Sequence, residues 1–437
     1  MQYINSRLKH QSLSKVQSCF SVKLIAESAN SIIVGCMSLE RRIKIQVKGK
    51  THQFFAVYPP GFEDIGVAEL KNAGITQIDN IETGGILFTA KIQQMMQAVI
   101  SCRGAVRILM RLASFNASNF SMLMRRLKNE IAWELYLPPK CIPDFSVSAV
   151  KSRLYHSDAV AEHARKAFVS MVGNDATPQE QTVYIRIVND KCTISLDCCK
   201  ESLQRRGYKI YTADAPLREN LASLLIERIA TQFPEKRYDA VYDPMCGSGT
   251  FLTEAALQNG KLQSKLASLR TFAFQQWPVY SEAAFNFIVH KQPPAFSHIF
   301  SDNLQIFGSD INNGNIRLTS ENTANLGLTI INNFSEMLDE PAIHLMTADF
   351  FKTTKKSIPF KEKMLLIFNP PYGKRLKIDK KTFFTQIGSH LKLHYKNCDA
   401  LVIVPDEEAE KAMKLYYEKK WIFKNGGLPV AALFFRL

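Results

Sequence analysis

Several features that mark other classes of protein are missing from this sequence of 437 residues. It contains no run of roughly 18 apolar residues, so it predicts no transmembrane helix. The apolar stretches near the N-terminus are interrupted by Lys23, Glu27 and Asn30, which is unlike a signal peptide. The 9 cysteines include no CxxC pair, which argues against a zinc ribbon and a disulfide framework. These absences predict a reducing, cytoplasmic setting.

The common nucleotide and metal motifs are also missing. The sequence has no G-x-G-x-x-G dinucleotide fingerprint, and no Gly-Lys-Ser/Thr follows its glycine-rich turn, so a P-loop is excluded. His390 and His394 lie four positions apart, as in zinc-binding helices, but HExxH and an obvious third ligand are absent. We therefore expect a plain surface helix there, and no metal cofactor.

A large excess of positive charge is present instead. The formal net charge is +15, and 46% of the residues are hydrophobic against 22% charged, which is typical of a folded globular protein. The length favours two or three domains. The charge favours a polyanionic partner, although a merely soluble basic protein would show the same excess.

The first part of the chain has the pattern of a small α+β unit. Strand-like residues 53–58 precede a short helix ending at Gly74, and a second strand covers 84–90. Residues 101–115 are predicted to be helical, with Arg103, Arg107 and Arg111 on one helix face. A solvated basic face and a stripe that contacts phosphates are both compatible with that spacing.

Residues up to 212 continue this basic character. Residues 145–150 predict a strand, followed by a turn with Lys151 and Arg153 and a helix that begins near Ser157. Residues 182–199 alternate in polarity on both sides of Asn189-Asp190, which predicts a β-hairpin. Arg205 and Arg206 then lie close to two tyrosines, and such a mixture suits RNA, which offers phosphates and exposed base faces.

From residue 213 onward, strands and helices alternate, which predicts a doubly wound α/β sheet. Four predicted strands end in polar residues: Asp243, Asp310, Asp349 and Asn369. In such folds the ligand crevice lies at the carboxyl ends of the strands. A strand-end aspartate often only caps the next helix, but four polar strand ends in succession favour a ligand site.

The residues around Asp243 favour a cationic ligand without phosphate. Gly247 and Gly249 let the backbone approach a ligand closely, but the carboxylate of Asp243 would repel a pyrophosphate. S-adenosylmethionine fits, since it offers a sulfonium, an ammonium, a ribose and an adenine. Asp243 can meet its positive end, Asp310 its ribose and Asp349 its adenine.

The sequence FNPPYG, residues 368–373, predicts the site of methyl transfer. The Asn369 side-chain oxygen and the Pro370 carbonyl can accept hydrogen bonds from an exocyclic amine and stabilise its developing positive charge. Pro370 and Pro371 fix the backbone, and Tyr372 offers a face on which a flipped-out base can stack. A proline-stiffened loop with a buried tyrosine is the structural alternative.

DPMCGSGTFLTEAA and FNPPYG together resemble the THUMP-containing class I methyltransferases that modify the exocyclic amine (N2) of guanine in RNA. Within that family the chain is most similar to the amino-terminal half of the fused, bifunctional bacterial enzymes that act on large-subunit (23S) ribosomal RNA. The resemblance covers residues 53–437. It implies four segments: an extension of unknown role (1–50), a ferredoxin-like subdomain (51–100), a THUMP RNA-binding domain (101–212) and a methyltransferase domain (213–437).

The resemblance also implies roles for individual residues. The S-adenosylmethionine site would comprise Pro216, Leu217, Asn220, Asp243, Pro244, Cys246, Gly247, Gly249, Thr250, Asp310, Ile311, Asp349, Phe350 and Asn369. The target base would meet Asn369, Pro370, Pro371 and Tyr372. The RNA would contact Arg103, Arg107, Arg111, Lys151, Arg153, Arg205, Arg206, Lys374 and Arg375.

Other functions stay open at this stage. The NPPY motif suits adenine in DNA as well as guanine in RNA, and relatives with this architecture also act on transfer RNA. A non-catalytic RNA-binding factor in ribosome assembly is the alternative outside enzymes. The retained Asp243, Asp310 and Asn369 argue against it, since a dead enzyme need not keep them.

Overall fold

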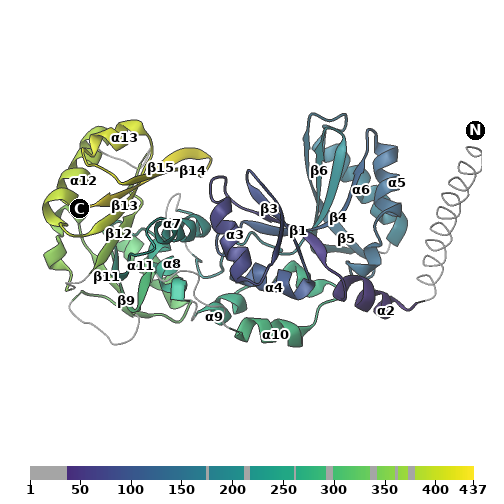
Figure 1. Ribbon diagram of the computed structural model, residues 1–437, viewed down its shortest axis with the longest axis horizontal. Helices are drawn as coiled ribbons and strands as arrows, with labels where there is room; N and C mark the ends of the chain where they lie inside the picture. The colour runs from purple at the N-terminus through teal and green to yellow at the C-terminus, as the bar shows by residue number, and fades with distance from the viewer. Residues whose placement is uncertain are drawn as a thin grey trace, which may run out of the picture.

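The computed structural model describes residues 37–173, 177–210, 217–259, 262–291, 299–334, 342–359, 363–372 and 379–437. The chain folds around two β-sheets, one in each half, and helices pack against both (Figure 1). No helix among the described residues is long and apolar enough to cross a membrane.

The N-terminal half contains a seven-stranded sheet with the order β2-β3-β1-β4-β7-β6-β5. Its strands are β1 (His52–Val57), β2 (Gln77–Glu82), β3 (Gly85–Ala90), β4 (Arg107–Asn116), β5 (Cys141–Val150), β6 (Thr177–Val188) and β7 (Lys191–Asp197). Its helices are α2 (Leu39–Ile43), η1 (Lys44–Lys48), α3 (Glu63–Asn72), α4 (Ile92–Ser101), α5 (Phe120–Asn129), η2 (Trp133–Leu135) and α6 (Ser157–Val172). The predicted β-hairpin is confirmed, since Asn189 and Asp190 have φ values of 50° and 62°, as a type I′ turn requires.

The helix expected over residues 101–115 is wrong. Helix α4 ends at Ser101, and β4 begins at Arg107 and pairs with both β1 and β7. Ile108, Leu109 and Met110 are buried while Arg107 and Arg111 are half-buried, and the two-residue alternation of a strand puts both arginines on one side. A spacing of four residues fits this alternation as well as a helix, so the arginines alone did not discriminate.

Part of the predicted N-terminal extension belongs to this half. Val47 is fully buried in its core. The Nε2 atom of His52 lies 2.8 Å from the Val47 carbonyl oxygen, and Arg42 forms an ion pair with Glu134 at 2.8 Å. Residues 37–50 therefore pack against the module that follows them.

The C-terminal half contains an eight-stranded sheet with the order β10-β11-β9-β8-β12-β13-β15-β14. The six neighbouring strands β10, β11, β9, β8, β12 and β13 are parallel, which confirms the predicted doubly wound α/β fold. The strands are β8 (Tyr238–Asp243), β9 (Phe300–Asp310), β10 (Thr329–Ile331), β11 (Ala342–Thr347), β12 (Met364–Phe368), β13 (Asp399–Val404), β14 (Lys419–Asn425) and β15 (Leu428–Arg436). The helices are α7 (Glu219–Gln232), α8 (Thr250–Ala256), η3 (Leu257–Asn259), α9 (Gln263–Ser268), η4 (Ala273–Gln276), α10 (Glu282–His290), α11 (Asn313–Ala324), η5 (Phe350–Lys352), η6 (Lys355–Ser357), α12 (Lys380–His394) and α13 (Glu407–Ala412).

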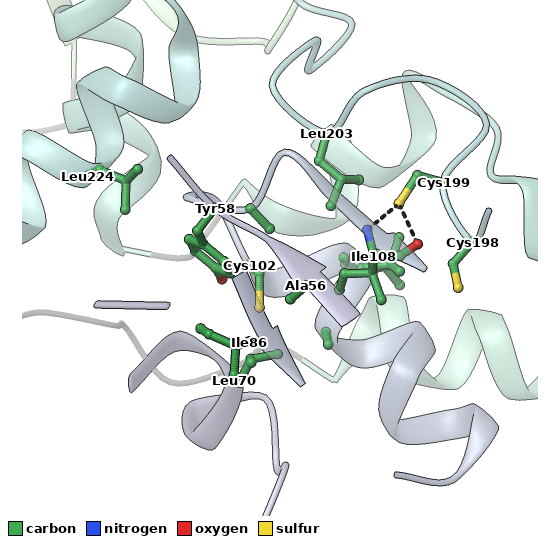
Figure 2. Close-up of a cluster of buried hydrophobic side chains, with 14 of the residues drawn as sticks. Ala56, Tyr58, Leu70, Ile86, Cys102, Ile108, Cys198, Cys199, Leu203 and Leu224 are labelled. Carbon is green, nitrogen blue, oxygen red and sulfur yellow. Dashed lines mark hydrogen bonds between the residues drawn. The ribbon is translucent and has the colours of Figure 1, made fainter. Parts of the chain in front are cut away.

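The two halves share one continuous hydrophobic core. Figure 2 shows Leu203 of the connecting segment and Leu224 of α7 beside the strands of the N-terminal sheet. A Cβ atom at Gly104 would lie 2.4 Å from a methyl carbon of Leu224, so only glycine lets α7 approach this loop. Trp277, from the aromatic segment 272–287, is buried and donates a hydrogen bond to the Gln181 side chain of β6 at 3.1 Å.

Candidate active site

The four polar strand ends lie along one edge of the C-terminal sheet. Neighbouring strands occur in the order β11-β9-β8-β12, and residues paired across them include Thr347 with Asp310 and Leu366 with Tyr242. Since parallel strands end at the same edge, the order along it is Asp349, Asp310, Asp243 and Asn369. The strand order therefore brings the four residues to the same edge of the sheet, as the sequence predicts.

The turn between β8 and α8 leaves room for a ligand. Gly247 has φ 56°, and a Cβ atom at this position would have no atom within 4 Å. Gly249 has φ 78°, and its Cβ would lie 2.6 Å from the Thr319 methyl carbon of α11. The first glycine therefore borders open space, while the second lets the turn pack closely against α11. The buried Ser248 hydroxyl has no hydrogen-bond partner in the described part of the chain.

The two central carboxylates are held by backbone amides. Asp310 accepts hydrogen bonds from the amides of Gly247 at 3.0 Å and Asn312 at 2.8 Å, so it fixes the glycine turn against β9. Asp243 is 3% exposed. Burial, with the charge of Asp310 as a smaller contribution, raises its pKa well above the usual value, although a hydrogen bond from the Met245 amide opposes this rise. A cationic ligand beside Asp243 would favour its charged form.

The residues expected at the adenine end divide into two groups. Asp349 is half-buried and caps η5 by accepting a hydrogen bond from the Phe351 amide at 3.0 Å. Ile311, directly after Asp310, is 72% exposed, which is unusual for a large apolar side chain and suits the face of a base. The ring of Phe350 points into the core and packs against Phe368 and Tyr395. Only its backbone is available for the predicted cofactor contact.

Three further predicted cofactor residues belong to the turn itself. Pro244 is buried, and the Thr250 hydroxyl accepts a hydrogen bond from Lys209 at 2.7 Å. Cys246 is buried, and burial raises the pKa of its thiol well above the usual value. A protonated thiol is a poor nucleophile, so Cys246 serves the shape of the turn.

The segment before α7 lies on the side of the turn that faces the N-terminal half. Leu217 is buried, and its carbonyl accepts a hydrogen bond from Thr250 at 3.4 Å. Asn220 is fully buried, and its side-chain amide donates a hydrogen bond to the Gly104 carbonyl at 3.2 Å. The side-chain oxygen of Asn220 has no hydrogen-bond partner among the described residues. Pro216 lies outside the described residues.

Asn369, directly after β12, carries a buried polar atom that points to a ligand. The side-chain oxygen of Asn369 is buried and has no hydrogen-bond partner among the described residues. Because an unsatisfied buried acceptor is costly, this oxygen is suited to a donor supplied by a ligand. Pro370 is buried, and Pro371 and Tyr372 are half-buried next to it.

One residue at this site was missed by the sequence analysis. Asn425, at the end of β14, donates a hydrogen bond to the Tyr372 hydroxyl at 3.0 Å. The Arg218 guanidinium donates to the neighbouring Lys424 carbonyl at 3.1 Å. The hairpin β14–β15 therefore holds both Tyr372 and the start of α7. The Gly426-Gly427 pair between two strand-like segments could have signalled this hairpin.

The prediction that Arg206 and Arg103 contact RNA is wrong. Arg206 is 1% exposed and forms a two-pronged ion pair with Glu254 of α8 at 3.1 and 3.2 Å. It also donates to the Arg103 carbonyl at 2.7 Å. Arg103 is 5% exposed and lies 3.7 Å from Glu227. Both guanidinium groups are buried at the junction of the two halves, where they cannot reach a macromolecule.

The other predicted RNA contacts lie at the surface or outside the described residues. Arg205, Lys151 and Arg153 are exposed, and Arg153 pairs with Asp190 at 2.8 Å. Arg107 and Arg111 are half-buried on β4. Lys374 and Arg375 lie outside the described residues.

The predicted surface helix around His390 is partly wrong. The helix exists as α12, but His390 is only 8% exposed, and its Nε2 atom lies 2.8 Å from the Thr353 carbonyl oxygen. His394, one turn later, is exposed. Among the described residues no group of three His, Cys, Asp or Glu side chains is placed to hold a metal ion.

The parallel sheet, the glycine turn and the acids at its carboxyl edge are those of a class I methyltransferase with an N-terminal α+β module. Residues 206–431 match the family described as "RMKL-like, methyltransferase domain", and residues 53–109 match the "RlmL ferredoxin-like domain". The chain belongs to this family of RMKL-like methyltransferases.

Individual relatives agree with this family. The chain is 29% identical over 404 residues to "Putative RNA methyltransferase slr0064" of Synechocystis sp., covering 89% of this chain and 97% of that protein. It is 28% identical over 402 residues to "Ribosomal RNA large subunit methyltransferase K/L" of Cellvibrio japonicus, covering 88% of this chain but 51% of the relative. It thus spans about half the length of the K/L protein.

Among solved structures, the chain is similar to that of SMU.472, described as "a putative methyltransferase complexed with SAH". The TM-score is 0.73 at 26% identity, covering 89% of this chain and 98% of the other.

Proposed function

We propose that this protein transfers a methyl group from S-adenosylmethionine to the exocyclic amine (N2) of a guanine in large-subunit (23S) ribosomal RNA. The observation that carries the choice of an amine is the buried side-chain oxygen of Asn369, which has no hydrogen-bond partner in the described part of the chain. An exocyclic amine is a hydrogen-bond donor, and it would satisfy this oxygen. The large-subunit RNA is proposed from the K/L relatives, and the cytoplasm is the corresponding location.

The order of side chains along the sheet edge fits the cofactor. Asp349, Asp310 and Asp243 follow one another across β11, β9 and β8, which matches adenine, ribose and the methionine moiety in sequence. The open space beside Gly247 and the exposed Ile311 offer room for it. When bound, S-adenosylmethionine supplies an electrophilic methyl group on a positively charged sulfur.

The residues of the chain would act mainly by positioning. Asn369 comes next along the edge after Asp243, so an amine held by its side-chain oxygen would lie beside the methionine end of the crevice. Accepting a hydrogen bond from the amine concentrates electron density on nitrogen and stabilises the positive charge that develops there. Tyr372, held by Asn425, would stack on the base and fix its angle of approach. The proton leaves the amine after transfer, so no strong general base is required.

We further propose that residues 51–100 and 101–212 form the ferredoxin-like and THUMP parts of an RNA-binding module and that residues 213–437 form the catalytic domain. This division is supported by the match of residues 53–109 to the ferredoxin-like domain. In the structure both parts of the module contribute to one sheet, because β1 pairs with β4.

The test is methyl transfer from labelled S-adenosylmethionine to total RNA, ribosomal precursor particles and genomic DNA, each from a strain that lacks this protein, followed by nucleoside analysis. We expect guanosine that carries one labelled methyl group on its exocyclic amine, in large ribosomal RNA. The same product in transfer RNA would keep the reaction and overturn the substrate. Label that enters only adenine in DNA would overturn the RNA assignment. Intact cofactor binding without transfer to naked RNA or to ribosomal precursor particles would favour a non-catalytic assembly factor.

A further inference from the structure

We infer that one face of the N-terminal sheet is the surface on which a structured RNA docks through its phosphates; this inference rests on the proposed function. The outer face, as we name it, carries Arg107, Arg111, Tyr184, Arg186, Thr193 and Ser195.

The strand register places these side chains on the same side of the sheet. Ser195 of β7 pairs with Arg111 of β4 and with Tyr184 of β6, and Thr193 pairs with Arg186. Directly paired residues point to the same side, and so do residues two positions apart. Contacts agree with this register, since Arg111 donates to the Ser195 hydroxyl at 2.8 Å.

The opposite side of the sheet is occupied by the hydrophobic core. Ile108, Met110, Ile185 and Ile194 alternate with the outer residues and are buried, and they share one core cluster with helix residues such as Leu123 of α5. Arg186 on the outer face is exposed, Arg107, Arg111, Tyr184 and Thr193 are half-buried, and Ser195 is buried. The outer face is therefore the polar side of the sheet.

Positive charge on the outer face is only partly neutralised. Arg107 pairs with the buried Asp197, but Arg186 forms no ion pair with the described residues, and Arg111 bonds a neutral hydroxyl. Burial lowers the pKa of Arg111, the charge of Glu82 opposes this shift, and the charge of Arg186 adds a smaller lowering. Glu82 offsets only part of this positive charge, and the remainder is stabilised by an external anion.

The arginines are also held in place in advance. The Arg111 guanidinium lies 4.5 Å from the centre of the Phe55 ring, and that of Arg107 lies 5.6 Å from the Tyr184 ring. Guanidinium groups stacked in this way keep their planes fixed and lose little freedom when they bind phosphate. The half-buried Thr193 hydroxyl on this face suits ribose and phosphate oxygens, so RNA is the polyanion we assign.

A matched pair of charge reversals tests the outer face. Arg186→Glu changes it, whereas Arg125→Glu makes the same change on α5, whose buried residues face the other side of the sheet; Arg125 is exposed and has no ion pair with the described residues. Lys191, exposed at the start of β7 and two positions before Thr193, lies on the same side of the sheet, so Lys191→Glu is a second outer-face variant. The probe is a labelled RNA hairpin with a stem of about 16 base pairs, and affinity is measured at several salt concentrations.

For Arg186→Glu we expect affinity to fall roughly tenfold and the slope of log affinity against log salt to shrink by about 1. Lys191→Glu should act in the same direction, and Arg125→Glu should change neither quantity. Equal losses from Arg125→Glu and Arg186→Glu, or full affinity in both outer-face variants, would overturn the inference. If the outer-face variants lose the same affinity for a DNA hairpin of the same sequence, the surface binds polyanions in general and the assignment to RNA is wrong.

The same variants separate this inference from the proposed function. If the unmodified protein methylates RNA while both outer-face variants keep full RNA affinity, only the docking surface is wrong. If the unmodified protein neither binds nor methylates RNA, the proposed function fails as well. Circular dichroism of each variant shows that a loss does not arise from unfolding.

Discussion

The two sheets place their polar side chains in different positions. In the C-terminal sheet, Asp243, Asp310 and Asn369 stand at the ends of parallel strands and gather at one edge. In the N-terminal sheet, Arg111 and Arg186 alternate with core residues and share a face. An edge of this kind forms a narrow crevice for a small ligand, whereas a face offers a broad surface for a macromolecule. One chain thus combines two ways to build a binding site.

The largest effect is expected at the crevice, from Asn369→Ala. Removal of the side-chain oxygen takes away the acceptor for the amine, and we expect methyl transfer to fall by about 100- to 1,000-fold. Cofactor affinity, measured by equilibrium dialysis, should stay largely intact. Asn303→Ala, at the exposed start of β9, is the matched control and should leave transfer unchanged. Loss of cofactor affinity together with transfer in Asn369→Ala would contradict the assigned role.

The second prediction concerns the adjacent arginines at the junction of the sheets. Arg206→Met leaves Glu254 buried without its partner, which should lower the free energy of unfolding by about 3–5 kcal/mol. Arg205→Ala changes an exposed neighbour and should cost no more than about 0.5 kcal/mol. Urea denaturation measures both. Adding Glu254→Gln to Arg206→Met should recover part of the loss, and equal effects of the two single changes would refute the buried pair.

The pH dependence of cofactor binding tests the charge at Asp243. Its pKa is raised by burial, so the carboxyl becomes protonated as the pH falls and can no longer pair with a cationic ligand. Affinity should therefore rise with pH, by about tenfold per pH unit below that pKa, and level off above it. Isothermal titration with S-adenosylmethionine checks this trend. Asp243→Asn should bind more weakly with a flat profile, and a steep profile in this variant would point to another group.

The smallest effect is expected at the hydrogen bond that holds Tyr372. Asn425→Ala should reduce kcat by about threefold to tenfold, because one hydrogen bond contributes roughly 0.5–1.5 kcal/mol. Tyr372→Phe removes the same bond from the other side. If Asn425 acts through Tyr372, the double variant should be no slower than the slower single variant. Independent, additive losses would show that Asn425 has a different role.

The crevice was predictable from the sequence, while the arginines of the other sheet were not. A parallel strand brings its last residue to the sheet edge whatever its neighbours are, so Asp243, Asp310 and Asn369 could be placed from their own segments. The direction of an arginine depends on which strands pair. Arg103 and Arg206 therefore looked like surface residues, and Arg107 and Arg111 looked helical.

The sequence by itself determined the methyltransferase fold, the strand-end acids and the motif around Asn369, because strand periodicity and turn residues are local properties. Only the tertiary structure decided that Arg206 is buried against Glu254, that Asn425 holds Tyr372, and that Arg111 and Arg186 share a face. These relations join residues far apart in the chain, and they arise only when strands and helices pack. Burial and pairing, rather than residue type, separate the structural arginines from those available to RNA.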